Sequence, residues 1–99
     1  MAHCPPALLD DIADVLGDVR SWPGIVEKSP GVFYARRNPF LHFHLVDGER
    51  RRADVKGRGD WTEIELPRPL PAAVKRTLLR LLRDSHREKS APKPRRQVS

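Results

Sequence analysis

The fold is decided by the stretch Phe40-Leu41-His42-Phe43-His44-Leu45-Val46, which alternates large apolar side chains with histidines. Alternate side chains on a β-strand point to opposite faces, so this pattern predicts a strand with one apolar and one polar face. The short segment Asp47-Gly48-Glu49 follows, and a second strand-like run then begins at Arg50 and ends at Lys56. Together these segments predict a β-hairpin.

The length of the hairpin loop selects the register of the two strands. A two-residue loop would place the apolar residues of the first strand opposite charged residues, which is unfavourable on a buried face. A three-residue loop places them opposite a largely apolar set, so we expect that register. It pairs Leu41 with Val55, Phe43 with Ala53, Leu45 with Arg51, His42 with Asp54 and His44 with Arg52.

A third strand is expected at residues 61–66, where Trp61, Glu63 and Glu65 alternate with more apolar residues. Gly57-Arg58-Gly59-Asp60 would form a four-residue turn before it. This turn carries the register across to the third strand and pairs Lys56 with Trp61. The polar face then holds two rows, which are His42–Asp54–Glu63 and His44–Arg52–Glu65.

Further helices and strands are expected before and after these three strands in the sequence, and they complete the predicted domain. A helix with an apolar stripe is expected from Pro5 to Ser21, and it ends at Trp22-Pro23-Gly24. Short strands are expected near 25–26 and at 32–37, with a break at Asn38-Pro39. A second helix follows Pro71, and its stripe consists of Val74, Leu78, Leu81 and Leu82.

These elements predict an α+β two-layer sandwich, in which an antiparallel sheet of four to five strands carries two helices on one face. The order is helix, strands, helix. A chain of 99 residues makes one domain. We place that domain at residues 5–88 and expect residues 89–99 to be a basic, disordered tail, since they offer little apolar surface to bury.

The net charge of +6 is concentrated near the C-terminus. Residues 70–99 contain nine basic and two acidic residues, whereas residues 1–69 are nearly balanced. A single cysteine, Cys4, excludes an intrachain disulfide. The N-terminus lacks the features of a signal peptide, and no apolar run is long enough to cross a bilayer. We therefore expect a cytoplasmic protein without a membrane partner.

The open polar face of the sheet is the first candidate site. It would bind a ligand through His42, His44, Arg52, Asp54, Trp61 and Glu63. One interpretation is a divalent metal held by His42, His44, Asp54 and Glu63, since imidazole and carboxylate are suitable ligands. Another is a platform on which Trp61, the histidines and Phe33 stack bases. The third is an ordinary solvated sheet face, with paired charges and no ligand.

The second helix and the tail form the second candidate site. Their basic residues would attract a polyanion, which predicts weak binding of nucleic acid or of an acidic protein. Aspartates at 10, 11, 14 and 18 would neutralise part of this charge if the two helices pack side by side, and basic tails also serve solubility alone. The residues concerned are Arg76, Arg80, Arg83, Arg87, Lys93, Arg95 and Arg96.

The sequence offers no catalytic residues and no cofactor site. Ser21, Ser29 and Thr62 have no base beside them in sequence, and the glycines at 57 and 59 lack the pattern of a phosphate-binding loop. We therefore expect a small binding module without catalysis that uses the open face or the basic tail. The alternative is a metal-binding protein or metal-dependent enzyme that uses the histidine and carboxylate cluster.

Several short motifs resemble those of known small bacterial domains. They are Trp22-Pro23-Gly24-Ile25, the pair His42 and His44, Ala53-Asp54-Val55 and the late strand that begins at Trp61. The chain in these respects resembles the YjbR/MmcQ-like family, whose fold is similar to that of frataxin. It also resembles a small family that carries a luciferase name. Both resemblances imply a helix, an antiparallel sheet and a closing helix, and neither implies catalytic residues.

Overall fold

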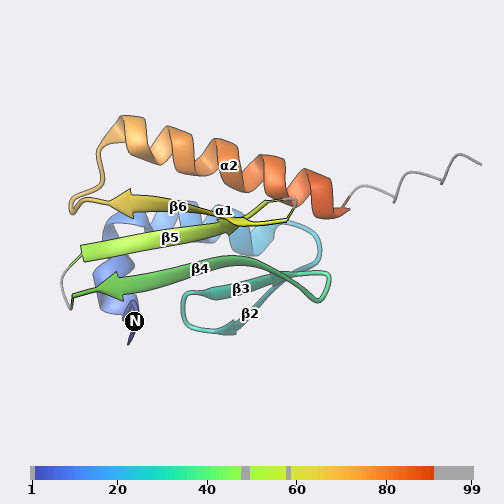
Figure 1. Cartoon of the computed structure of the whole chain (residues 1–99), viewed down its shortest axis with the longest axis horizontal. Coiled ribbons are helices and arrows are strands. Elements are labelled where there is room, and N and C mark those ends of the chain that lie inside the picture. Colours follow the sequence, from blue (N-terminus) through green and yellow to red (C-terminus); the bar gives the residue numbers. More distant parts are fainter. Residues whose placement is uncertain (1, 48–49, 58, 91–99) are drawn as a thin grey trace, which may run out of the picture.

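The computed structural model describes residues 2–47, 50–57 and 59–90, and Figure 1 shows their arrangement. The strands β2 to β6 form an antiparallel sheet in sequence order, and the two-residue strand β1 pairs with the end of β4. The elements are β1 (Ala2–His3), the 3-10 helix η1 (Pro6–Ile12), α1 (Ala13–Ser21), β2 (Ile25–Ser29), β3 (Val32–Ala35), β4 (Asn38–Val46), β5 (Arg50–Lys56), β6 (Trp61–Leu66) and α2 (Ala72–Ser90).

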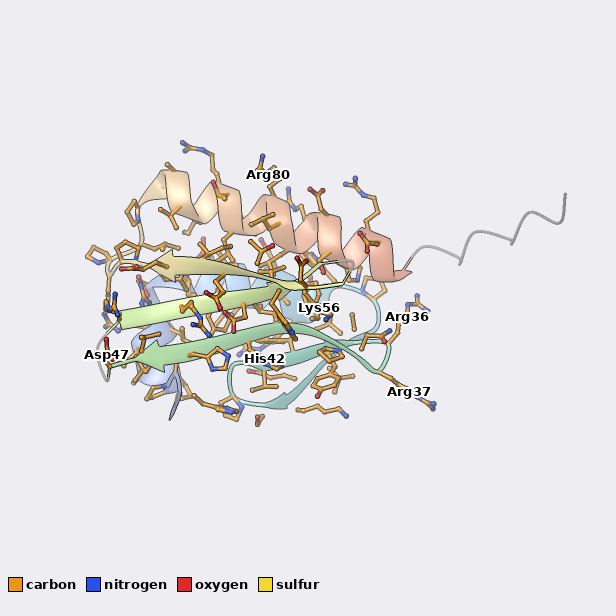
Figure 2. All side chains as sticks on the ribbon, in the orientation of Figure 1. Arg36, Arg37, His42, Asp47, Lys56 and Arg80 are labelled. Carbon is orange, nitrogen blue, oxygen red and sulfur yellow. The ribbon has the colours of Figure 1, made fainter. Side chains whose placement is uncertain are left out.

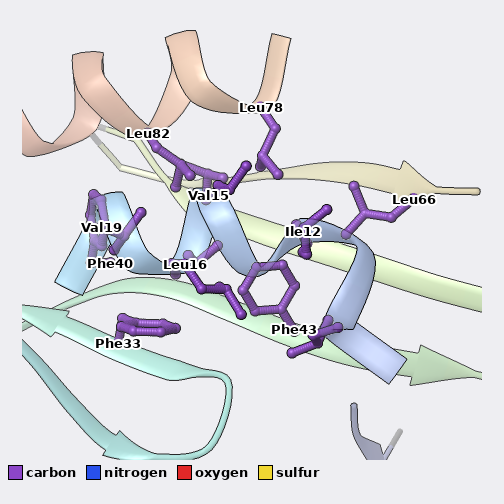
Figure 3. Close-up of a cluster of buried hydrophobic side chains, with 14 of the residues drawn as sticks. Ile12, Val15, Leu16, Val19, Phe33, Phe40, Phe43, Leu66, Leu78 and Leu82 are labelled. Carbon is purple, nitrogen blue, oxygen red and sulfur yellow. The ribbon is translucent and has the colours of Figure 1, made fainter. Parts of the chain in front are cut away.

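This architecture confirms the expected α+β fold, with one helical region before the strands and one after them. Both helical regions contribute to a single apolar core with one face of the sheet, as Figure 3 shows. The other face of the sheet carries no helix from the described residues, and we call it the open face. Within the described residues, no helix is long and apolar enough to cross a membrane.

The register of the central hairpin agrees with the register expected from the sequence. β4 ends at Val46 and β5 begins at Arg50, which confirms the three-residue connection. His42 lies opposite Asp54 and His44 lies opposite Arg52. The next pairing is also confirmed, and it joins Ala53 to Ile64, Asp54 to Glu63 and Lys56 to Trp61.

The core is larger than the alternating pattern of β4 and β5 alone indicates. Leu41, Phe43, Ala53, Val55 and Leu66 are buried as expected, and Leu45 and Ile64 pack against them. The helices add Ile12, Val15, Leu16, Val19, Leu78 and Leu82. The sequence argument missed the core residues Cys4, Leu9, Phe33, Ala35 and Phe40.

The connection between β3 and β4 differs from the expectation. The chain turns at Arg36 and Arg37, which both have positive φ angles (49° and 74°), and β3 already ends at Ala35. Asn38 and Pro39 are the first two residues of β4, whereas we expected them to form a break between two strands. A two-residue turn with positive φ matches the twist of a hairpin, but it usually contains asparagine and glycine, so two arginines gave no turn signal.

The two helices also depart from the expected boundaries. The first begins as a 3-10 helix over Pro6–Ile12 and becomes an α-helix at Ala13. The second extends to Ser90 and so enters the segment that we assigned to the tail. Residues 91–99, with the basic residues Lys93, Arg95 and Arg96, lie outside the described part of the chain.

Arg51 closes one end of the core. Its side chain is only 2% exposed, and its guanidinium donates to both carboxylate oxygens of Asp11. It also donates to the carbonyl oxygens of Leu8, Leu66 and Pro67, at 2.7 to 3.2 Å. Every N–H of the guanidinium is therefore used. Arg51 ties η1, β5 and the end of β6 together.

Candidate functional site

The open face gathers polar and aromatic side chains from five strands. Its members sit at positions that alternate with buried core residues, and Figure 2 shows His42 and Lys56 on this side of the sheet. The set comprises Lys28 from β2, Tyr34 from β3, His42 and His44 from β4, Arg52, Asp54 and Lys56 from β5, and Trp61 and Glu63 from β6.

Three rings form a continuous row across this face. The centroids of the Tyr34 and His42 rings are 6.4 Å apart, and those of His42 and Trp61 are 5.0 Å apart. The ring planes are tilted by 38° and 37°. We call Tyr34, His42 and Trp61 the aromatic row. All three side chains are partly exposed, so the row presents ring surface to solvent.

A lysine lies over each end of the aromatic row. The Lys28 Nζ atom is 4.4 Å from the centroid of the Tyr34 ring. The Lys56 Nζ atom is 5.2 Å from the centroid of the Trp61 ring. Such cation–π contacts hold the ammonium groups near the rings while the charge stays close to water. The row is therefore flanked by positive charge on both sides.

Asp54 is the centre of a polar cluster that lies beside the aromatic row. Its carboxylate accepts two hydrogen bonds from Arg52, at 2.8 and 3.0 Å, and lies 3.2 Å from Nε2 of His44. We expected His42 to lie beside Asp54, because the two are cross-strand partners. The carboxylate instead contacts the diagonal neighbour His44, since Arg52 on the same strand draws it toward that side. Glu63 lies 3.6 Å from Arg52 and is largely exposed.

This geometry does not assemble the expected metal ligands. The Asp54 oxygens are occupied by Arg52 and His44, and Glu63 is turned toward Arg52. Among residues 2–47, 50–57 and 59–90, no group of three or more histidine, cysteine, aspartate or glutamate side chains is arranged to hold a metal ion. His42, the fourth residue of the hypothesis, belongs to the aromatic row.

One ring nitrogen of each β4 histidine is shielded from water, although both side chains are partly exposed. The Nε2 atom of His42 and the Nδ1 atom of His44 are buried, and neither has a hydrogen-bond partner in the described structure. Burial lowers the pKa of His42 below its ordinary value of 6.5, and the nearby imidazole of His44 lowers it further. Asp54 opposes these effects but does not outweigh them. His42 is therefore neutral near pH 7 and behaves there as an aromatic ring.

Sequence reasoning missed two members of the open face and misplaced one. Tyr34 and Lys28 were not among the expected site residues, and Phe33, which we had placed on the platform, is buried in the core. The alternation of Val32 to Ala35 contains the necessary signal, because Phe33 and Ala35 share one face. Only the position of the turn at 36–37 tells which face that is.

The arginines expected on the outer side of α2 are exposed along the helix, and Figure 2 shows Arg80 pointing away from the sheet. They are Arg76, Arg80, Arg83 and Arg87, and we call them the arginine ridge. They line a shallow hollow together with Leu79 and Asp84. The ridge lies apart from the open face, because it sits on a helix that packs against the opposite side of the sheet.

Comparison with known proteins adds no assignment to this geometry. No protein-family model, no curated protein and no solved structure matches the chain. The resemblance to the YjbR/MmcQ-like family and to the luciferase-named family therefore stays a prediction from short motifs.

Proposed function

We propose that this chain is a non-catalytic binding module that binds single-stranded nucleic acid on the open face of its sheet. The observation that carries the proposal is the aromatic row, with a lysine over each end. A single-stranded nucleic acid presents bases that stack on aromatic side chains and phosphates that pair with cations. The open face offers both kinds of group side by side.

The distribution of charge favours binding of the strand at one end of the open face, the end that carries Lys56. Lys56 and the two turn arginines, Arg36 and Arg37, lie toward the same end of the sheet in Figure 2, and Asp47 lies at the far end. Glu63 and Glu65 are exposed on β6 and would repel phosphates. A bound strand would therefore stack on Tyr34, His42 and Trp61 and direct its phosphates toward the lysines.

The polar cluster and the aromatic row have different roles on this face. The Arg52–Asp54–His44 cluster is internally paired, so it holds the strands β4 and β5 together and supports the platform. The rings of the aromatic row present partly exposed surface instead. Base stacking on such rings contributes about 1–3 kcal/mol per base, which makes Trp61 the most informative residue to remove.

The test is titration of a labelled single-stranded oligonucleotide with the full chain at low salt, followed by fluorescence anisotropy. Trp61→Ala should weaken binding by roughly 10- to 100-fold, and Trp61→Phe should retain most of it. Thr62→Ala is the matched control, because Thr62 is the exposed next residue on the same strand. If folded Trp61→Ala and Tyr34→Ala proteins bind as the unchanged chain does, the open face is not the site.

The lysines are tested separately by salt dependence. Each cation that contacts a phosphate of a single strand contributes about 0.7 to the slope of log affinity against log salt. Replacing both Lys28 and Lys56 by Gln should therefore lower the slope by about 1.4. A slope that does not change would show that neither lysine contacts the strand.

A further inference from the structure

The arginine ridge gathers four exposed arginines along one side of α2. Its residues Arg76, Arg80 and Arg83 have no ion-pair partner within residues 2–47, 50–57 and 59–90. The fourth, Arg87, is 3.9 Å from Asp84, at the limit of an ion pair, and both side chains are exposed. The ridge therefore keeps most of its positive charge.

Six other basic side chains among the described residues have ion-pair partners. The partners are Arg20 with Glu27, Arg50 with Asp47, Arg51 with Asp11, Arg52 with Asp54, Arg68 with Asp10 and Lys75 with Asp14. The last pair decides a question that the sequence left open. An aspartate of α1 does reach α2, but it contacts Lys75 on the inner side and leaves the ridge alone.

The spacing of the ridge suits a regular polyanion. Steps of four, three and four residues along a helix that rises about 1.5 Å per residue give a line of about 16 Å with one arginine per turn. Duplex DNA carries one phosphate charge per about 1.7 Å of its axis, so such a line faces several phosphates at once. A guanidinium can donate two parallel hydrogen bonds to each phosphate.

We infer that the arginine ridge binds the phosphate backbone of a nucleic-acid duplex, as a second surface independent of the open face. The ridge contains no aromatic side chain, so it offers no base stacking, and its contacts would be independent of sequence. An even line of like charges fits the repeating phosphates of a duplex better than the uneven carboxylates of an acidic protein. The full chain would thus hold duplex and single strand on different sides.

The experiment measures binding of the full chain to a labelled blunt duplex over a series of salt concentrations. The double variant Arg80→Gln, Arg83→Gln should lower the slope of log affinity against log salt by about 1.8, since each duplex contact contributes about 0.9. The matched control is Arg50→Gln, Arg68→Gln, which removes the same net charge from two arginines that are already paired. The control should leave the slope almost unchanged.

Three outcomes would overturn the inference. Equal effects of the two double variants would mean that only net charge matters. An unchanged slope in the ridge variant would place duplex binding elsewhere, for example in the basic residues beyond 90. Polyglutamate serves as a probe for an acidic protein. If the ridge variant loses binding to polyglutamate but keeps its binding to the duplex, the partner of the ridge is an acidic protein. Trp61→Ala should leave duplex binding intact, so failure of this inference is distinguishable from failure of the proposed function.

Discussion

Arg51 and Arg52 are adjacent in the sequence, yet they lie on opposite faces of the sheet and have different surroundings. The Arg51 side chain is 2% exposed and is held by Asp11 and three backbone carbonyls. The Arg52 side chain is 19% exposed, and its main partner is Asp54, which it shares with His44. One arginine is part of the interior, and the other is part of a surface.

The contrast shows how the two faces of this small sheet differ in the completeness of their side-chain contacts. On the helix side, even the charged residue has a complete set of partners, so that side is closed. On the open face, the paired cluster occupies only part of the surface, and the aromatic row beside it stays partly exposed. Alternation along β5 places each side chain on one face or the other.

Removing Arg51 should have the largest effect on folding. Arg51→Met removes the ion-pair partner of Asp11 and leaves its carboxylate with the Leu70 N–H as a donor, and loss of such a largely buried pair typically costs about 3–5 kcal/mol. Arg52→Gln should cost no more than about 1 kcal/mol, because its pair is partly solvated. Urea unfolding of both variants provides the measurement. Equal losses of unfolding free energy in the two variants would show that Arg51 and Arg52 contribute equally to folding.

Removing a ring from each face compares packing in the same way. Phe43 is buried in the core, so Phe43→Ala should lower the free energy of unfolding by about 3–5 kcal/mol. Tyr34→Ala removes a partly exposed ring and should cost clearly less, while it weakens binding to single strands. If Tyr34→Ala unfolds the chain as readily as Phe43→Ala does, the aromatic row is a structural layer and not a binding surface.

The central hairpin shows what could be predicted from the sequence. Only one loop length placed the apolar side chains of β4 opposite apolar partners, so the register of β4, β5 and β6 followed from the pattern. The β3–β4 turn was not predictable in this way, because Arg36 and Arg37 adopt positive φ angles that arginine rarely adopts. Without that turn, Tyr34 could not be assigned to the open face.

The register of the site residues on β4, β5 and β6 was predicted from the sequence, but their side-chain contacts were not. Cross-strand pairing placed His42 opposite Asp54, and this is correct for the backbone. Side-chain contacts also depend on diagonal neighbours and on residues two apart, and here Arg52 and His44 compete for the same carboxylate. Pairing rules do not rank these alternatives, because each lies within reach of a long side chain.

The smallest expected effect concerns His42 and its response to pH. Burial and the neighbouring His44 lower the pKa of His42, so just below pH 6.5 the unfolded chain binds more protons at this residue than the folded chain does. The contribution of His42 to the free energy of unfolding is therefore fully present above pH 6.5 and declines as the pH falls below that value. Asp11 does not interfere, because Arg51 lowers its pKa below 3.8.

Binding to an anion should show the opposite dependence, because a phosphate near His42 favours the protonated ring. Between pH 7.5 and about 5, stability should fall while affinity for a single strand rises. His42→Phe keeps a ring in the aromatic row but removes the titrating group, so it should flatten both curves and retain binding at pH 7.5. The two curves come from urea unfolding and anisotropy at matched pH values. If affinity in the unchanged chain falls in parallel with stability, no phosphate lies near His42, and the aromatic row binds something other than an anionic strand.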